Sequence, residues 1–284
     1  MGPSESFMPF WSNNPVLERE IRGRLRLRRK GGLGANVWIA RAIGLVTLYY
    51  YSRGLLALWR GTSQDARDLW PLLIYSALAL IVLLAPVLTA TAITQEREQQ
   101  TWEILATTRL SGADILLGKW LGRQMIPGLL LAILLPYMAI CAARASFSWL
   151  MLPAIFTFLL ITSACYSALG LLCSFQAKRT MTATASALTV TALLCIGTIA
   201  VNQVFSLLLS PMASNYEWPV LWTNPFYVLT YLINAFAPDA FSGINQNTDP
   251  ADAIAFYCLG TLALTAAMLG FMVSRYRQAV REQS

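Results

Sequence analysis

Three carboxylates lie close together in the most polar internal stretch of the chain, residues 94–124, which separates two long apolar runs. Glu96, Glu98 and Glu103 could serve as general acids or bases, bind a metal ion, or form ion pairs with another protein. Acid–base and metal chemistry would need a second reactive group within reach, and the chain has no His to provide one. We therefore interpret the stretch as a docking surface whose charges set the register of a soluble partner. The alternative is a solvated helix face without a partner.

We expect the polar stretch to begin with a charged helix over residues 95–106, which extends the preceding apolar run. Trp102, Leu105 and Ala106 would form a small apolar edge on this helix, at positions i, i+3 and i+4. Residues 107–110 are expected to break it. The predicted docking face comprises Glu96, Glu98, Thr101, Trp102, Glu103 and Leu105.

A second helix is expected after the break. Ser111 is its predicted cap, and Asp114 follows three residues later, which is the spacing of a capping box ahead of an apolar run. Gly118 and Gly122 have the GxxxG spacing that accompanies close packing of helices in membranes. The second helix should therefore lead into the next apolar run.

The overall composition is typical of a membrane protein. Of the 284 residues, 56% are hydrophobic and only 12% are charged, about half the charged fraction of a soluble domain. Recurring apolar runs predict an all-α polytopic fold. The first run begins near Val37, too late for a cleavable signal peptide, so we expect it to insert as a signal anchor. The five Cys all lie in apolar segments without a CxxC pair, which indicates packing residues.

Six apolar runs are long enough, at about 1.5 Å per residue, to cross a hydrocarbon core of about 30 Å. They cover residues 37–59, 69–93, 125–142, 150–173, 181–209 and 253–274. The chain then divides into an N-terminal segment, residues 1–36, and a six-span domain, residues 37–284. None of the runs carries a central Asp or Glu, which disfavours a carrier coupled to protons or sodium.

The basic residues predict how the chain is oriented. Most of the 21 Lys and Arg fall in the N-terminal segment, the polar stretch, the connection with Lys178 and Arg179, and the C-terminal tail. All of these lie on the same side of the six spans. By the positive-inside rule, both termini and residues 94–124 are cytoplasmic, and we expect a plasma (bacterial inner) membrane. The net charge of +7 is then explained by topology, and we expect no nucleic-acid partner.

The N-terminal segment predicts a basic amphipathic helix on the membrane surface. Asn14 and Pro15 are typical of the first residues of a helix. Apolar residues then recur every four positions on one face, and arginines accumulate toward the end of the helix. The residues assigned to this surface helix are Leu17, Ile21, Leu25, Arg22, Arg26 and Arg29. Such a helix binds anionic membrane lipid, with binding to a partner protein as the alternative.

The loop at residues 210–252 is predicted to lie on the outer side. It is apolar and aromatic, but Pro219 and Pro225 interrupt it too often for a continuous span. Trp and Tyr favour the membrane interface. We therefore expect a pair of short helices that lie at, or dip into, the outer interface.

The segment QEREQQTWEILATTRLSGADILLGKWLG resembles the signature of ABC-2 type permeases, the membrane subunits of one class of ATP-driven exporters. The matching positions are Glu96, Glu98, Thr101, Glu103, Leu105, Gly118 and Lys119. The chain departs from that pattern at Gln100, where the family usually has Gly, and at residues 109–111, where it often has Pro. The segment NPVLEREIRGRLR is similar to the opening of some such permeases.

The resemblance implies a half-transporter with six spans, a coupling element after the second span and re-entrant outer helices between the fifth and sixth. Two such domains, identical or different, would pair, and each would dock an ATPase subunit through its coupling element. The chain has no G-x-x-x-x-G-K-[ST] phosphate loop. ATP and Mg²⁺ would therefore be bound by a separate ATPase, and this chain itself would hold no cofactor or metal and would not be an enzyme.

The alternatives to a permease are an intramembrane enzyme and a non-transporting membrane protein. An intramembrane enzyme is disfavoured because the chain has no His and no acid in the middle of a span. A non-transporting membrane scaffold or assembly factor has no sequence feature against it. The polar residues of the spans are mainly Ser and Thr, which are common contacts between helices in membranes.

Overall fold

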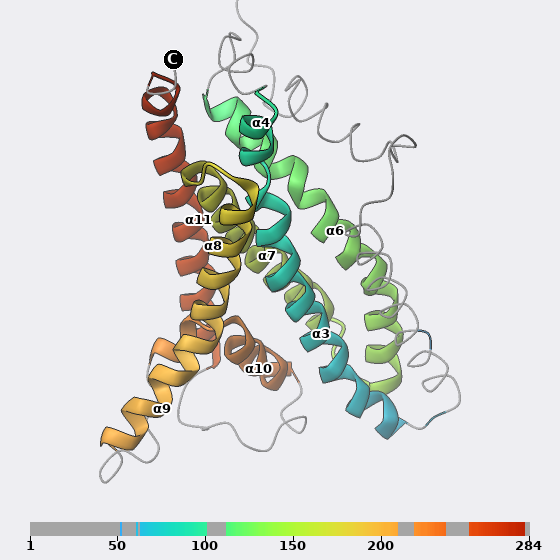
Figure 1. The fold of residues 1–284 in the computed structure, drawn as a ribbon. Coiled ribbons are helices and arrows are strands. Elements are labelled where there is room, and N and C mark those ends of the chain that lie inside the picture. The colour runs from blue at the N-terminus through green and yellow to red at the C-terminus, as the bar shows by residue number, and fades with distance from the viewer. Residues whose placement is uncertain are drawn as a thin grey trace, which may run out of the picture.

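The structure is a computed structural model of the chain that describes Ser52, Gly61 and residues 63–100, 112–209, 219–236 and 250–281. Every regular element in these ranges is a helix, which confirms the all-α prediction for this part of the chain (Figure 1). The predicted surface helix of residues 1–36 and the first predicted span lie outside the described residues. So do four residues of the predicted docking face, Thr101, Trp102, Glu103 and Leu105.

Five helices of the described residues are long and apolar enough to cross a membrane, and they match the second to sixth predicted spans. They are α3 (Ser63–Ala90) with the short α4 (Thr94–Glu98), α6 (Gly112–Ala145), α7 (Met151–Gln176), the combination of α8 (Thr180–Ala192), η1 (Leu193–Gly197) and α9 (Thr198–Leu209), and α11 (Pro250–Arg281). α6 begins directly after Ser111 and continues through the third span. The second predicted helix of the polar stretch is therefore the first part of α6.

α7 is the central helix of the bundle. Two thirds of its apolar window (67%) is buried, against 11% for α8 to α9 and 17% for α11. It packs against α3, α6, α8 and α11. A close approach of α3 and α7 occurs at Gly170, where an added Cβ would collide with the carbonyl oxygen of Pro86 and with Oγ1 of Thr89. Small residues allow such contacts between helices in membranes.

The connection between α9 and α11 contains two short helices among its described residues. These are the 3₁₀ helix η2 (Pro219–Thr223) and α10 (Pro225–Phe236), where the sequence predicted a pair of short helices. The hydroxyls of Tyr75 in α3 and Thr230 in α10 lie 2.7 Å apart, which joins α10 to the bundle. The rings of Trp222 and Phe256 are 5.9 Å apart, so η2 also contacts α11.

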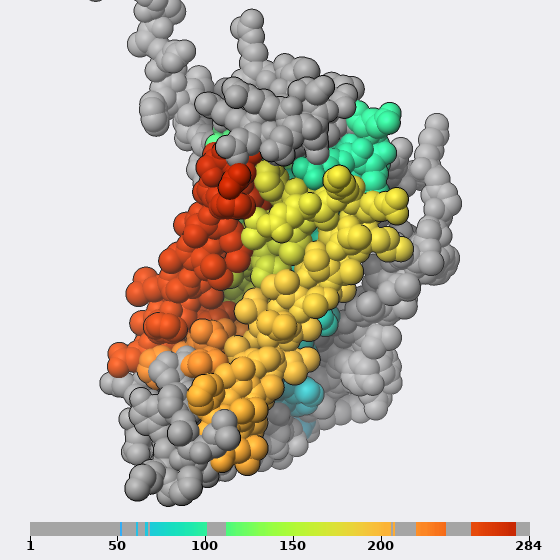
Figure 2. Space-filling view, turned by 60° about the vertical axis from the view of Figure 1, so that its left-hand side comes forward, coloured from blue at the N-terminus to red at the C-terminus, as the bar shows by residue number. Residues whose placement is uncertain are grey.

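The described basic side chains divide between the two ends of the bundle. The end that holds α4 and the last turns of α7 and α11 carries Arg97, Lys119, Arg123, Lys178, Arg179 and Arg275 (Figure 1). The other end carries Arg67 and Arg144, which donate to the carbonyls of Ala145 at 3.4 Å and Gly61 at 2.7 Å. Figure 2 shows α8 and α9 along the surface of this face of the molecule, from one end to the other.

Candidate functional site

The helix of the second span does not continue into the polar stretch as one charged helix, and that prediction is wrong. α3 ends at Ala90, residues 91–93 form a turn, and α4 ends at Glu98. Gln100 has a φ of 56°, in the left-handed region that residues other than Gly rarely adopt. An α-helix over residues 95–106 is therefore interrupted by its sixth residue. The permeases that this segment resembles usually have Gly at this position. Gly adopts the left-handed backbone without strain, which is a physical reason for that preference.

Threonine hydroxyls accompany the break between α3 and α4. Oγ1 of Thr89 donates to the carbonyl of Ala85 at 2.9 Å, and Oγ1 of Thr94 donates to the carbonyl of Ala90 at 3.1 Å. Such bonds to preceding carbonyls compete with the backbone ladder and bend helices. The break still leaves carbonyl and amide groups of residues 88–94 that need partners from outside α3.

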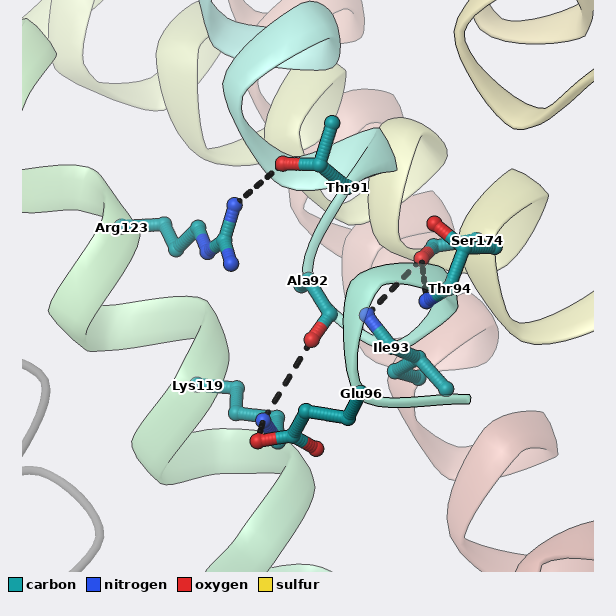
Figure 3. Close-up of polar contacts among 8 residues, drawn as sticks. All are labelled: Thr91, Ala92, Ile93, Thr94, Glu96, Lys119, Arg123 and Ser174. Carbon is teal, nitrogen blue, oxygen red and sulfur yellow. Dashed lines mark hydrogen bonds and ion pairs between the residues drawn. The ribbon is translucent and has the colours of Figure 1, made fainter. Parts of the chain in front are cut away.

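Two cations of α6 bind polar groups at the break, and Figure 3 shows Lys119 directed at the carbonyl of Ala92 and Arg123 at Oγ1 of Thr91. Nζ of Lys119 donates to the carbonyl of Ala92 at 3.4 Å. Nη1 of Arg123 donates to the carbonyl of Leu88 and to Oγ1 of Thr91, the latter at 2.7 Å. Lys119 is 1% exposed and Arg123 is 6% exposed. The last carbonyls of a helix carry a negative partial charge, so buried cations are favourable at this place.

Ser174 of α7 binds the amides on the other side of the break. Its Oγ accepts hydrogen bonds from the backbone N–H of Ile93 at 2.9 Å and of Thr94 at 3.2 Å (Figure 3). The side chain is fully buried. Ser174 therefore caps the start of α4, a role that usually belongs to the residue directly before the helix. The start of α4 is fixed by a residue about eighty positions away in the sequence.

The three charged residues of α4 each bind a different part of the bundle. Oε1 of Glu96 lies 2.5 Å from Nζ of Lys119 in α6. Nη1 of Arg97 donates to the carbonyl of Ala177 after α7 at 2.9 Å. Oε1 of Glu98 accepts from the backbone N–H of Thr180 at 2.8 Å and from its hydroxyl at 3.0 Å, which caps the start of α8. α4 is thereby bonded to α6, to the α7–α8 connection and to α8.

An apolar cluster lies under these polar contacts. Ile93 packs there with residues of α6, α7 and α11, including Ile115, Phe175 and Met272. Further along α6, Nε1 of Trp120 donates to Oγ of Ser167 in α7 at 2.9 Å. The surrounding helices thus stabilise the break through both polar and apolar contacts.

The described residues of the predicted docking face, Glu96 and Glu98, both lie on α4 and are bound within the chain. Glu96 is partly buried, whereas Glu98 is exposed. That either of them contacts a partner stays a prediction. Sequence reasoning missed Arg123 and Ser174. Arg123 follows Lys119 by four residues, so the two cations share a helix face, and this spacing could have identified it.

The described residues contain no group of three or more His, Cys, Asp or Glu side chains that could hold a metal ion. What the site offers instead is a short charged segment at one end of the bundle, bonded to three of its helices. A family model described as ABC-2 family transporter protein matches residues 17–279. A comparison with curated proteins found no match.

Proposed function

Because the chain belongs to the ABC-2 family of transporter proteins, we propose that it is the membrane-spanning permease subunit of an ATP-driven exporter. A separate ATPase subunit would bind ATP and Mg²⁺ and supply the energy. The observation that carries this proposal is α4, whose charged residues bond to α6, to the α7–α8 connection and to α8 at one end of the bundle. A protein that moves α4 would act on all three at once.

The contacts of α4 suggest how a displacement would spread. Lys119 would carry it to α6, Ser174 to α7 and Thr180 to α8. Buried ion pairs and hydrogen bonds exchange between discrete arrangements more readily than they stretch, so the bundle would switch between two packings. Binding and hydrolysis of ATP in the partner would change the populations of the two packings and thereby the side to which the substrate path opens.

The basic end of the bundle supports the proposed orientation. Arg97, Lys119, Lys178 and Arg179 all lie at the α4 end, which the positive-inside rule places in the cytoplasm. A cytoplasmic ATPase would then reach α4 directly. We further propose that two permease domains pair, either two copies of this chain or this chain and a related one, and that residues 1–36 lie on the cytoplasmic membrane surface.

The docking face is proposed to include Glu96, Glu98, Thr101, Trp102, Glu103 and Leu105. Charge reversal at Glu96 or Glu98 would also break bonds within the chain, so these residues cannot report docking alone. Glu103→Lys and Trp102→Ala are the better variants. Asp252→Lys is the matched control because Asp252 is an exposed acid in the first turn of α11, at the opposite end of that helix from Tyr276.

The test is co-purification with an ABC ATPase subunit from the same organism that is co-expressed with this chain, followed by measurement of ATP hydrolysis in lipid nanodiscs. We expect Glu103→Lys and Trp102→Ala to reduce both ATPase retention and its stimulation at least tenfold, and Asp252→Lys to leave both unchanged. Full retention and stimulation with both variants would show that the docking assignment is wrong. Retention of the ATPase without any stimulation by the unaltered chain would indicate a non-transporting scaffold.

A further inference from the structure

The fifth span contains a π-helical turn in its middle. η1, at Leu193–Gly197, separates α8 from α9 without interrupting the helix. A π turn closes i→i+5 hydrogen bonds and so holds about one residue more than an α turn, and such turns occur mostly at functional sites. The proposed function gives this turn no role, because η1 lies far along the span from α4.

The packing of the fifth span changes at η1. Before it, Ala183, Ala187 and Thr191 of α8 are buried, and α8 packs mainly on α3 and α7. After it, α9 has no buried residue among those whose side chains are described, and its main partner besides η1 is η2. Figure 1 shows α9 leaning away from the bundle. The first half of the span therefore packs within the bundle, whereas the second half contacts mainly η2.

One fully buried side chain joins η1 to that segment. Nδ2 of Asn224, between η2 and α10, donates to the carbonyl of Cys195 at 2.7 Å and to Oγ1 of Thr198 at 2.8 Å. Its Oδ1 accepts from the backbone N–H of Phe226 at 2.9 Å, which fixes the start of α10. Both amide hydrogens of Asn224 are thus used on the fifth span, while its oxygen serves α10.

A π turn leaves carbonyls turned away from the regular ladder, and these need other donors when they are buried. Asn224 and Thr198 supply them, since Oγ1 of Thr198 also donates to the carbonyl of Leu194 at 2.9 Å. Bending the helix axis at a π turn with side-chain donors costs less free energy than bending it within a continuous run of α-helical hydrogen bonds. The change in packing partners at the same five residues indicates where such a change in angle would occur.

We infer that Asn224 is a positioning residue that maintains the π turn, and that η1 is a hinge at which α9 moves while α8 stays with α3 and α7, and α10 stays packed in the core with them. The inference goes beyond the proposed function and does not rest on it. The alternative is a π turn that is fixed by packing and allows no motion.

The test measures distances by pulsed electron resonance on the full chain in lipid nanodiscs, without an ATPase. Nitroxides are attached through unnatural amino acids at exposed positions, so the five native cysteines stay in place. Leu188 in α8 (40% exposed) and Val204 in α9 (54% exposed) report across η1. They are about 24 Å apart along the helix at 1.5 Å per residue, a suitable range for the method. Val204 and the exposed Ala235 of α10 report between α9 and the helix that Asn224 joins to η1.

Deletion of Ile196 is the decisive variant. Its side chain is 68% exposed, so the deletion removes little packing. Loss of one residue converts the π turn to an α turn and keeps α8 and α9 on their present faces. We expect a Leu188–Val204 distribution at least twice as wide in the unaltered chain as in the deletion variant. Equal widths in the two proteins would show that η1 is not a hinge.

Asn224→Ala is tested on the Val204–Ala235 pair, with Thr230→Ala as the control. Thr230 joins α10 to α3 through Tyr75 and makes no bond to η1. We expect Asn224→Ala to widen the Val204–Ala235 distribution at least twofold and Thr230→Ala to leave it unchanged. Equal widening by both variants, or by neither, would remove the positioning role of Asn224. If Asn224→Ala does not fold, Asn224→Leu replaces it, because it keeps the approximate shape and loses both donors.

Discussion

The ion pair between Lys119 and Glu96 gives the sharpest prediction about what holds α4 in place. Lys119 is 1% exposed, Glu96 is 19% exposed, and their charged atoms are 2.5 Å apart. Removing one partner of a buried pair costs about 3–5 kcal/mol because the remaining charge loses its counter-charge. Water reaches Glu96, so we expect the lower figure, about 3 kcal/mol, for the loss of unfolding free energy in Glu96→Gln.

The complementary changes complete a double-mutant cycle. Lys119→Met should cost only about 1 kcal/mol, because Glu96 can turn toward water once the ammonium is absent. The double variant should lose no more than about 1.5 kcal/mol, since removing both members of a buried pair is often nearly neutral. The predicted coupling energy is then about 2–3 kcal/mol.

The measurement is reversible unfolding of the purified chain in mixed micelles by titration with SDS, followed by the fluorescence of its nine Trp residues. Lys178→Met is the control, because Lys178 is an exposed cation at the same end of the bundle and its loss should stay within about 0.5 kcal/mol. Single-variant effects that add to within about 0.5 kcal/mol would refute the reasoning. They would mean that solvent screens the pair and that other contacts hold α4.

Three further predictions concern the stability of the same region and use the same assay. Gly170→Ala should lower the free energy of unfolding by at least about 3 kcal/mol or prevent folding, because the added Cβ would collide with the backbone of α3. Gly128→Ala has open space around it and should raise the free energy of unfolding by about 0.5 kcal/mol. Equal effects of the two changes would contradict the close approach at Gly170. Ser174→Ala should cost about 2 kcal/mol by leaving two buried N–H groups without an acceptor, and Ser274→Ala, whose exposed hydroxyl donates to the carbonyl of Phe271 in its own helix, should be neutral. Gln100→Gly should gain about 1 kcal/mol by relieving the left-handed backbone, and a loss would show that this conformation is not retained.

The five spans of the described residues could be predicted from the sequence because a bilayer leaves the backbone few choices. Without water in the hydrocarbon core, every amide and carbonyl must be bonded within the chain, and a long apolar helix achieves this locally. Hydropathy alone therefore located α3, α7 and α11 to within a few residues of most of their ends. The start of α6 followed from the equally local capping pattern at Ser111 and Asp114.

The break after α3 could not be predicted in the same way. The apolar character continues through Ala92 and Ile93, and Gln, Glu and Arg in the next turn are all good helix formers. Local preference thus favoured a straight helix. The groups that decide against it come from elsewhere in the chain, Arg123 from α6 and Ser174 from α7. The π turn of η1 is similar, because its stabilising donor, Asn224, is distant in sequence.

The break and the buried cations require each other. In a straight helix the carbonyls of Leu88 and Ala92 would accept bonds from the amides four residues later, and Lys119 and Arg123 would then be buried without these acceptors. In the broken helix, the carbonyls would lack donors if the cations were absent. Two arrangements are therefore self-consistent: a broken helix with bound cations, and a straight helix whose α6 cations have moved to water or to another anion. A segment with two such arrangements can be switched by a force applied to its charged end, because each arrangement opposes the intermediate positions.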